Sequence, residues 1–216
     1  MSRFVIAGWL AIAGVVFAQK AASPTASALK VYTSPDAAFR FTYPGLLIHC
    51  EKRPQGAGYV WVQKECAAYF PACDETLSLE LSKKKATVCL AYPRNQHTNS
   101  DTFEAATFSV AQIEEARDRS SCTLPKLDQI DRKKPGAKIG GVEFSAFETG
   151  EGGMNQGVTA EIYRTFHADK CYELTIAVVT ANAGAFDPPA RELTKADWDE
   201  VNHRLDQARD SFHFLK

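Results

Sequence analysis

Two stretches of alternating apolar residues, joined by a short polar segment, constrain the fold of this chain more than any other feature. Within 157–180, both apolar sets fall on even-numbered positions: Val158, Ala160, Ile162 and Phe166, then Tyr172, Leu174, Ile176 and Val178. A period of two is typical of a β-strand with one buried face. A hairpin that buries both sets together needs an odd number of loop residues, and Ala168-Asp169-Lys170 supplies three. This register predicts Phe166 opposite Tyr172 and His167 opposite Cys171.

The same register gathers polar side chains on the other face of the predicted hairpin. Four of them are our candidate binding residues: Glu161, Tyr163, His167 and Glu173. A base, a phenol and two carboxylates close together are suited to acid–base chemistry. The competing interpretation, which we favour, is a solvated sheet face with ordinary cross-strand pairs and no catalytic residue. Arg164 interrupts the apolar face, and we expect it at the sheet edge or paired with a carboxylate such as Glu143.

Further alternating segments predict more strands, and one segment predicts a helix. Strands are expected at 39–43, 77–81, 88–92 and 139–146, the last one interrupted by a bulge or turn at Gly140-Gly141. The helix follows a capping box of Thr194 and Asp197, and its apolar stripe is Trp198, Val201, Leu205, Ala208 and Phe212. Residues 111–120 fit either a second short helix or a polar strand extension. The fold class predicted is α+β: an antiparallel β-sheet with a C-terminal amphipathic helix packed on one face.

The first eighteen residues have the composition of a secretory signal peptide. Arg3 precedes an uncharged apolar run, and Val16 and Ala18 suit the −3 and −1 positions of a cleavage site. A retained membrane anchor is the alternative, but the run has about 15 residues where a span needs roughly 20. We expect a signal peptide at 1–18, a flexible linker at 19–29 and one domain at 30–216. The domain would be exported to the periplasm or the cell exterior, with membrane contact only through an uncleaved signal.

Six cysteines lie downstream of this signal, and an even number in an exported chain favours disulfides that staple the loops. Six cysteines allow 15 connectivities. The short proline-containing loop between Cys66 and Cys73 predicts that pair, with Cys89–Cys122 and Cys50–Cys171 as the remainder. A zinc site built from His49-Cys50 and His167-x3-Cys171 is the alternative. It is disfavoured because the sequence has no Cys-x2-Cys pair.

Composition and motifs point away from several functional classes. The sequence has no Gly-x-Ser-x-Gly, no His-Glu-x-x-His and no phosphate-binding loop. Removal of residues 1–18 takes away Arg3 and no acid, leaving 24 basic and 26 acidic residues. This balance gives no electrostatic reason to bind nucleic acid or an anionic membrane. We expect no cofactor and no metal.

The order of these features resembles a known family. A strand Phe39–Pro44, a strand opened by Gly140-Gly141, the segment Tyr163–Leu174 and a closing helix that ends at Ser211-Phe212 look like the PsbP-like secreted domains. The resemblance covers roughly residues 30–214, and it implies an antiparallel sheet flanked by helices. It also implies partner binding without shared catalytic residues. The cysteine-bearing segment Cys50–Cys89 departs from the family pattern.

These observations lead to one functional hypothesis and two alternatives. The leading hypothesis is an exported bacterial binding or assembly module of the cell envelope, not an enzyme, whose partner is another envelope protein. The alternatives are a secreted hydrolase and a metal-binding protein, each of which would use the polar face of the 157–180 hairpin.

Overall fold

The computed structural model describes residues 28–55, 58–61, 66, 84–97, 99–124, 132–153 and 156–215. Antiparallel sheets and one long C-terminal helix dominate these residues, which confirms the predicted α+β class. The predicted signal peptide, the strand at 77–81 and Cys73 lie outside the described residues. Within the described part of the chain, no helix has the length and apolarity needed to cross a bilayer.

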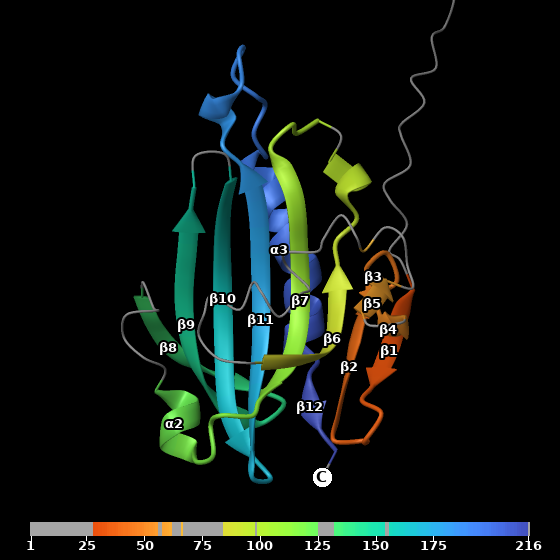
Figure 1. The fold of residues 1–216 in the computed structure, drawn as a ribbon, viewed down its shortest axis with the longest axis vertical. Coiled ribbons are helices and arrows are strands. Elements are labelled where there is room, and N and C mark those ends of the chain that lie inside the picture. Colours follow the sequence, from red (N-terminus) through yellow and green to blue (C-terminus); the bar gives the residue numbers. More distant parts are fainter. Residues whose placement is uncertain are drawn as a thin grey trace, which may run out of the picture.

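A seven-stranded antiparallel sheet forms the body of the domain (Figure 1). Its spatial order is β3-β6-β7-β11-β10-β9-β8. The strands are β3 (Ile48–Cys50), β6 (Lys84–Ala91), β7 (Phe103–Ile113), β8 (Arg132–Ile139), β9 (Val142–Gly152), β10 (Gln156–His167) and β11 (Lys170–Ala181). Gly140 and Gly141 make the two-residue turn between β8 and β9, so the predicted interruption of that segment is a hairpin turn.

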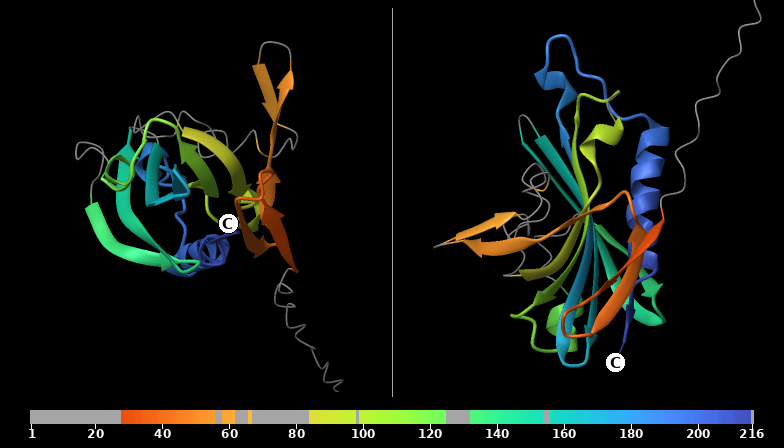
Figure 2. Two further views of the ribbon diagram at one scale, coloured as in Figure 1. Left: turned by 90° about the horizontal axis from the view of Figure 1, so that it is seen from below. Right: turned by 90° about the vertical axis from the view of Figure 1, so that its right-hand side faces the viewer.

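Among the described residues, two smaller sheets and two 3-10 turns accompany the large sheet. A three-stranded sheet consists of β1 (Leu29–Thr33), β2 (Phe39–Pro44) and β12 (His213–Phe214), with β2 in the middle. Strands β4 (Lys52–Gln55) and β5 (Gly58–Trp61) form a hairpin that extends away from the body (Figure 2). The 3-10 turns are η3 (Arg94–His97) and η5 (Ala183–Ala185).

The C-terminal helix α3 (Lys195–Asp210) lies along one face of the large sheet (Figures 1 and 2). Its predicted capping box is present: the Asp197 backbone N–H donates to Thr194, and Asp197 accepts from the Thr194 backbone N–H. Val201, Leu205 and Ala208 of the predicted stripe are fully buried, whereas Trp198 is only half-buried. The main core lies between this stripe, the inner face of β2 and the sheet.

The opposite face of the sheet is also covered. Helix α2 (Arg119–Thr123) packs there against β10 and β11, and Cys122 is fully buried. Residues 111–113 belong to the end of β7, which settles the open assignment of 111–120 as strand first and helix only from Arg119. Smaller apolar clusters also lie on this face, for example Phe147 with Ala160, Ile162 and Ala177. The sheet therefore has two buried faces.

The hairpin register differs from the predicted one because the β10–β11 loop has two residues. Ala168 and Asp169 both adopt positive φ angles (47° and 59°), as a tight primed turn requires. Phe166 consequently pairs with Cys171, and His167 pairs with Lys170. The even-numbered residues of β10 lie on the face opposite to those of β11. Because both faces of the sheet are buried, the apolar residues of β10 and those of β11 can lie on different faces.

All three predicted disulfide pairs are wrong. The described bonds are Cys50–Cys66 and Cys122–Cys171, and Cys89 is also disulfide-bonded. Cys171 is buried on the face that carries α2, so its partner comes from that helix and not from the Cys50–Cys89 segment. Disulfide-stapled loops are nevertheless a feature of the domain, as predicted.

Candidate functional site

The four predicted site residues do not share one face. Glu161 and Tyr163 lie on the α3 side of β10, whereas Glu173 lies on the α2 side of β11. His167 sits at the end of the hairpin, where its ring stacks on Phe214 with a centroid distance of 3.9 Å. An acid–base cluster on one polar face is therefore not formed. The one-residue change in register separates its members.

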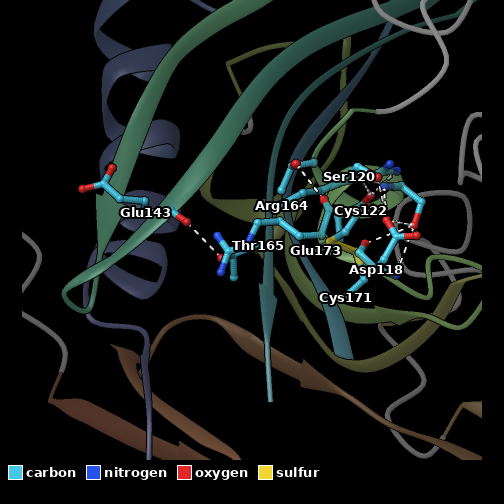
Figure 3. Close-up of a disulfide and its surroundings, with 11 residues drawn as sticks. Asp118, Ser120, Cys122, Glu143, Arg164, Thr165, Cys171 and Glu173 are labelled. Carbon is cyan, nitrogen blue, oxygen red and sulfur yellow. Dashed lines mark hydrogen bonds and ion pairs between the residues drawn. A yellow bond between two sulfur atoms is a disulfide. The ribbon is translucent and has the colours of Figure 1, made fainter. Parts of the chain in front are cut away.

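Glu173 instead forms a buried ion pair with Arg164 (Figure 3). The two residues lie directly opposite each other on β10 and β11, and Arg164 Nε donates to Glu173 Oε2 at 2.7 Å. The second carboxylate oxygen, Oε1, accepts from the Thr175 hydroxyl at 3.0 Å. The pair lies beside the Cys122–Cys171 disulfide, which helps α2 to cover it. Of the two arrangements expected for Arg164, pairing with a carboxylate is found, and the partner is Glu173 instead of Glu143.

The two cysteines of the alternative zinc site are also unavailable. Cys50 and Cys171 are both bonded in disulfides, so neither offers a thiolate. Among the described residues, no group of three or more histidine, cysteine, aspartate or glutamate side chains is placed to hold a metal ion.

A groove on the α3 side of the sheet brings together the remaining candidate residues. It has a volume of about 370 Å³ and runs between α3 and strands β9 to β11. Its apolar side chains are those of Ile176, Val178 and Trp198. Its polar surface comes from Glu148, Thr159, Glu161, Asn202 and Asp206. A pocket with an apolar floor and a few convergent polar groups is the usual form of a ligand site, and this volume is near the small end of the range.

Carboxylates dominate the rim of the groove, and their partner cations approach from outside the lining. Lys134 on β8 donates to Glu161 and lies 3.8 Å from Glu148. Arg132 donates to Glu148, and Arg209 lies 2.8 Å from Asp206. Every ionisable side chain among the described lining residues is therefore acidic. The basic residues that pair with these carboxylates do not line the groove.

Tyr163 lies behind the groove as a link between β10 and α3. Its hydroxyl donates to Glu161 and accepts from Arg209 Nη1 at 2.8 Å. The Arg209 guanidinium also lies over the tyrosine ring, 5.1 Å from its centroid. Burial, and then the hydrogen bond to Glu161, raise the pKa of Tyr163. This phenol stays protonated at neutral pH, and it positions Glu161.

The rim carboxylates differ in their preference for the ionised form. Burial raises the pKa of Asp206, and Arg209 offsets this only in part because Asp210 and Glu161 act in the same direction as burial. Burial also acts to raise the pKa of Glu161, but the hydrogen bonds from Lys134 and Tyr163 outweigh it, so that the pKa is lowered. The charge of Asp206 is thus less well compensated by its neighbours than the charge of Glu161.

Sequence reasoning found part of this groove and missed the rest. It named Glu161 and Tyr163, but it assigned Trp198 only to the core stripe. Trp198, Asn202 and Asp206 recur every four residues, and this spacing places them on one side of a helix. This second stripe, which lies next to the apolar one, was the sequence pattern from which the helix side of the groove could have been predicted. The contribution of β8 and β9 depends on strand order, which no local pattern reveals.

Comparison with known proteins gives only remote similarities. No protein-family profile and no curated protein matches this sequence. A crystal structure from Bacteroides thetaiotaomicron has 13% sequence identity and a TM-score of 0.43; the alignment covers 87% of this chain and 48% of the other, so this chain spans about half of its length. LpqN of Mycobacterium tuberculosis, described as involved in cell envelope biogenesis, has 7% identity and a TM-score of 0.42, with 88% and 91% of the two chains covered. At this level of similarity, neither structure informs the fold or the function of this protein.

Proposed function

We propose that this chain is an exported, non-catalytic binding or assembly module of the bacterial cell envelope, and that it binds its partner at the groove beside α3. The groove carries the proposal because it combines an apolar floor with converging carboxylates on rigid elements, three strands and a helix. Export is supported by the signal-like composition of residues 1–18 and by the disulfides, which persist in oxidising compartments.

The PsbP-like resemblance supports the same proposal at the level of family. An antiparallel sheet flanked by helices is the architecture that the resemblance implies, and partner binding is the role that goes with it. The hydrolase alternative loses its geometric basis, since Glu173 is buried in an ion pair on the other face of the sheet. Any turnover abolished by His167→Ala would count against the binding role.

Site-specific photo-cross-linking in the native envelope tests the proposal. A photoreactive amino acid replaces Asn202 in the groove and, in a matched control, Asp199, which is an exposed residue of the same helix outside the lining. We expect a discrete adduct with one identifiable protein from position 202 and none from position 199. Equal labelling from both positions, or none from either, would contradict a binding role for the groove.

The export component needs a separate measurement. Fractionation followed by N-terminal sequencing is expected to give a mature chain that begins at Gln19 and appears in the periplasm or the medium. A chain that keeps Met1 in the cytoplasm would overturn export without bearing on the groove.

A further inference from the structure

We propose that the groove recognises a primary ammonium group on an alkyl chain, presented as a lysine side chain by an extended segment of a partner protein. This inference rests on the proposed function and names the chemistry of the partner. The reasons are the sign of the lining charge, a lysine of this chain that already contacts the rim, and the size and polarity of the floor.

The sign of the charge selects a cation. Glu148, Glu161 and Asp206 come from two strands and one helix, and all three line the same groove. The side chains of Glu148, Glu161 and Asp206 are each 37% exposed, so an incoming ligand can reach them. Carboxylates accept hydrogen bonds from an ammonium group, and charge-assisted bonds of this kind are the strong ones. An anionic ligand would meet only acidic ionisable side chains among the described residues that line the groove.

Lys134 shows that the rim binds an ammonium group of this type. Its Nζ lies 2.5 Å from Glu161 Oε1 and 3.8 Å from Glu148 Oε2, and it approaches from the edge strand β8. The same two carboxylates are open to the groove on their other side. Lys134 is therefore an internal competitor for a ligand ammonium, and removing it should leave the rim more negative and more available.

The floor fits the alkyl part of a lysine side chain. Ile176 and Val178 are buried residues of β11, and half-buried Trp198 closes one side of the groove. Lysine commonly buries its methylene stem against apolar surface while its ammonium remains with polar groups. A volume of about 370 Å³ is small for a ligand site, and it suits one side chain better than a large cofactor. The open groove leaves room for the backbone that carries this side chain.

Asp206 supplies a less compensated charge than Glu161 does. Arg209 is its close partner, but Arg209 also donates to Asp210 and to the Tyr163 hydroxyl. A ligand ammonium between Asp206 and Glu161 would relieve the repulsion between these two carboxylates. We therefore assign the ammonium position to the space between β10 and the middle of α3.

Titration of the purified, disulfide-intact protein with Nα-acetyl-lysine N-methylamide tests the proposal. The matched probe is Nα-acetyl-norleucine N-methylamide, which keeps the alkyl chain and lacks the ammonium. NMR chemical shifts of the Trp198 indole N–H, assigned with Trp198→Phe, report on occupancy. We expect saturable shifts with the lysine probe. The norleucine probe should bind at least about fivefold more weakly, because one partly exposed charge pair contributes a factor of about five to the affinity.

Variants separate ammonium recognition from general effects of charge. Glu161→Gln and Asp206→Asn should each weaken binding of the lysine probe by about fivefold, whereas Lys134→Met should strengthen it by a similar factor. Asp199→Asn, which removes a carboxylate from the exposed side of the same helix, should leave the affinity unchanged. Circular dichroism of each variant checks that the fold is retained. Lys134→Met is decisive, because a merely structural lysine would not improve binding when removed.

The outcomes distinguish this inference from the proposed function. If both probes bind equally, or if Lys134→Met weakens binding, ammonium recognition is overturned while a binding groove remains. If neither probe binds but cross-linking from position 202 still captures one protein, the partner is recognised by other chemistry and this inference fails alone. If cross-linking also fails, the proposed function falls with it.

Discussion

Arg164 and Glu173 face each other across β10 and β11 with only 3% and 1% of their surfaces exposed, and Arg164 Nε donates to Glu173 Oε2 at 2.7 Å. Taking two charges out of water is costly, and the attraction between them compensates only while both are present. The disulfide-bonded α2 covers the pair, and Thr175 satisfies the second carboxylate oxygen. The pair therefore makes the α2 face sensitive to single substitutions.

Glu173→Ala should lower the free energy of unfolding by about 3–5 kcal/mol, because it leaves the Arg164 guanidinium buried without its partner. Urea denaturation followed by circular dichroism measures the change. The double variant Arg164→Met/Glu173→Leu is the control, and it should recover most of the loss since no unpaired charge remains. A double variant as unstable as the single one would show that the pair contributes through its shape and not through its charge.

The Cys122–Cys171 disulfide should stabilise the domain more than Cys50–Cys66 does. A cross-link that spans 49 residues restricts the unfolded chain more than one that spans 16. The expected contributions are about 4 and about 3 kcal/mol, respectively. The double variants Cys122→Ala/Cys171→Ala and Cys50→Ala/Cys66→Ala, compared by urea denaturation, test this order. A non-reducing peptide map of the unaltered protein should yield both linked peptides; recovery of a Cys50–Cys171 peptide would contradict the structure.

The positions of strands and of the C-terminal helix were predicted from the sequence far better than the contacts between residues distant in the sequence. Alternation located β2, β6 and β9, and the capping box of Thr194 and Asp197 located the start of α3. These signals are local. The hairpin register failed because it assumed one buried face, whereas α3 and α2 cover both faces of the sheet. Ala168 at positive φ gave no warning of a two-residue turn, since alanine rarely adopts that conformation.

The candidate site was less predictable for the same reason. Glu161 and Trp198 come from segments that were read correctly, but their meeting depends on how α3 crosses β10. Lys134 reaches the groove only because β8 follows β9 at the sheet edge. Disulfide connectivity is likewise a consequence of packing, since Cys122 finds Cys171 through the position of α2 and not through any spacing in the sequence.

Gly140 and Gly141 should respond very differently to alanine, although they are adjacent and both have positive φ angles (56° and 84°). A Cβ at Gly140 would collide with the Phe212 carbonyl oxygen and come within 2.8 Å of His213 Cα, whereas one at Gly141 would meet nothing within 4 Å. Gly141→Ala should cost about 1–2 kcal/mol of backbone strain. Gly140→Ala should cost a further 1–3 kcal/mol or so, because β12 must shift. Thermal unfolding of both variants measures the difference. Equal losses of stability would mean that Phe212 and His213 do not lie against Gly140.

Asp101 and Asp206 should show opposite pH dependence when each is replaced by asparagine. Hydrogen bonds from the Arg191 side chain and backbone N–H hold the pKa of Asp101 at about 2, below its ordinary 3.8. Its contribution to stability is present above pH 3.8 and is lost as pH falls through about 2. Asp101→Asn should therefore lower the urea midpoint near neutral pH and lose this effect as the pH approaches 2.

Asp206 has the opposite sign because burial raises its pKa above 3.8. Its contribution is fully present below pH 3.8 and is lost as pH rises through the raised folded-state pKa. The stability of Asp206→Asn relative to the unaltered protein should thus increase with pH, since asparagine resembles the protonated acid. Urea midpoints of both variants, measured at intervals between about pH 2 and pH 6, give the two slopes. Parallel slopes would mean that burial does not raise the pKa of Asp206 and that the charge of this carboxylate is compensated in the folded protein.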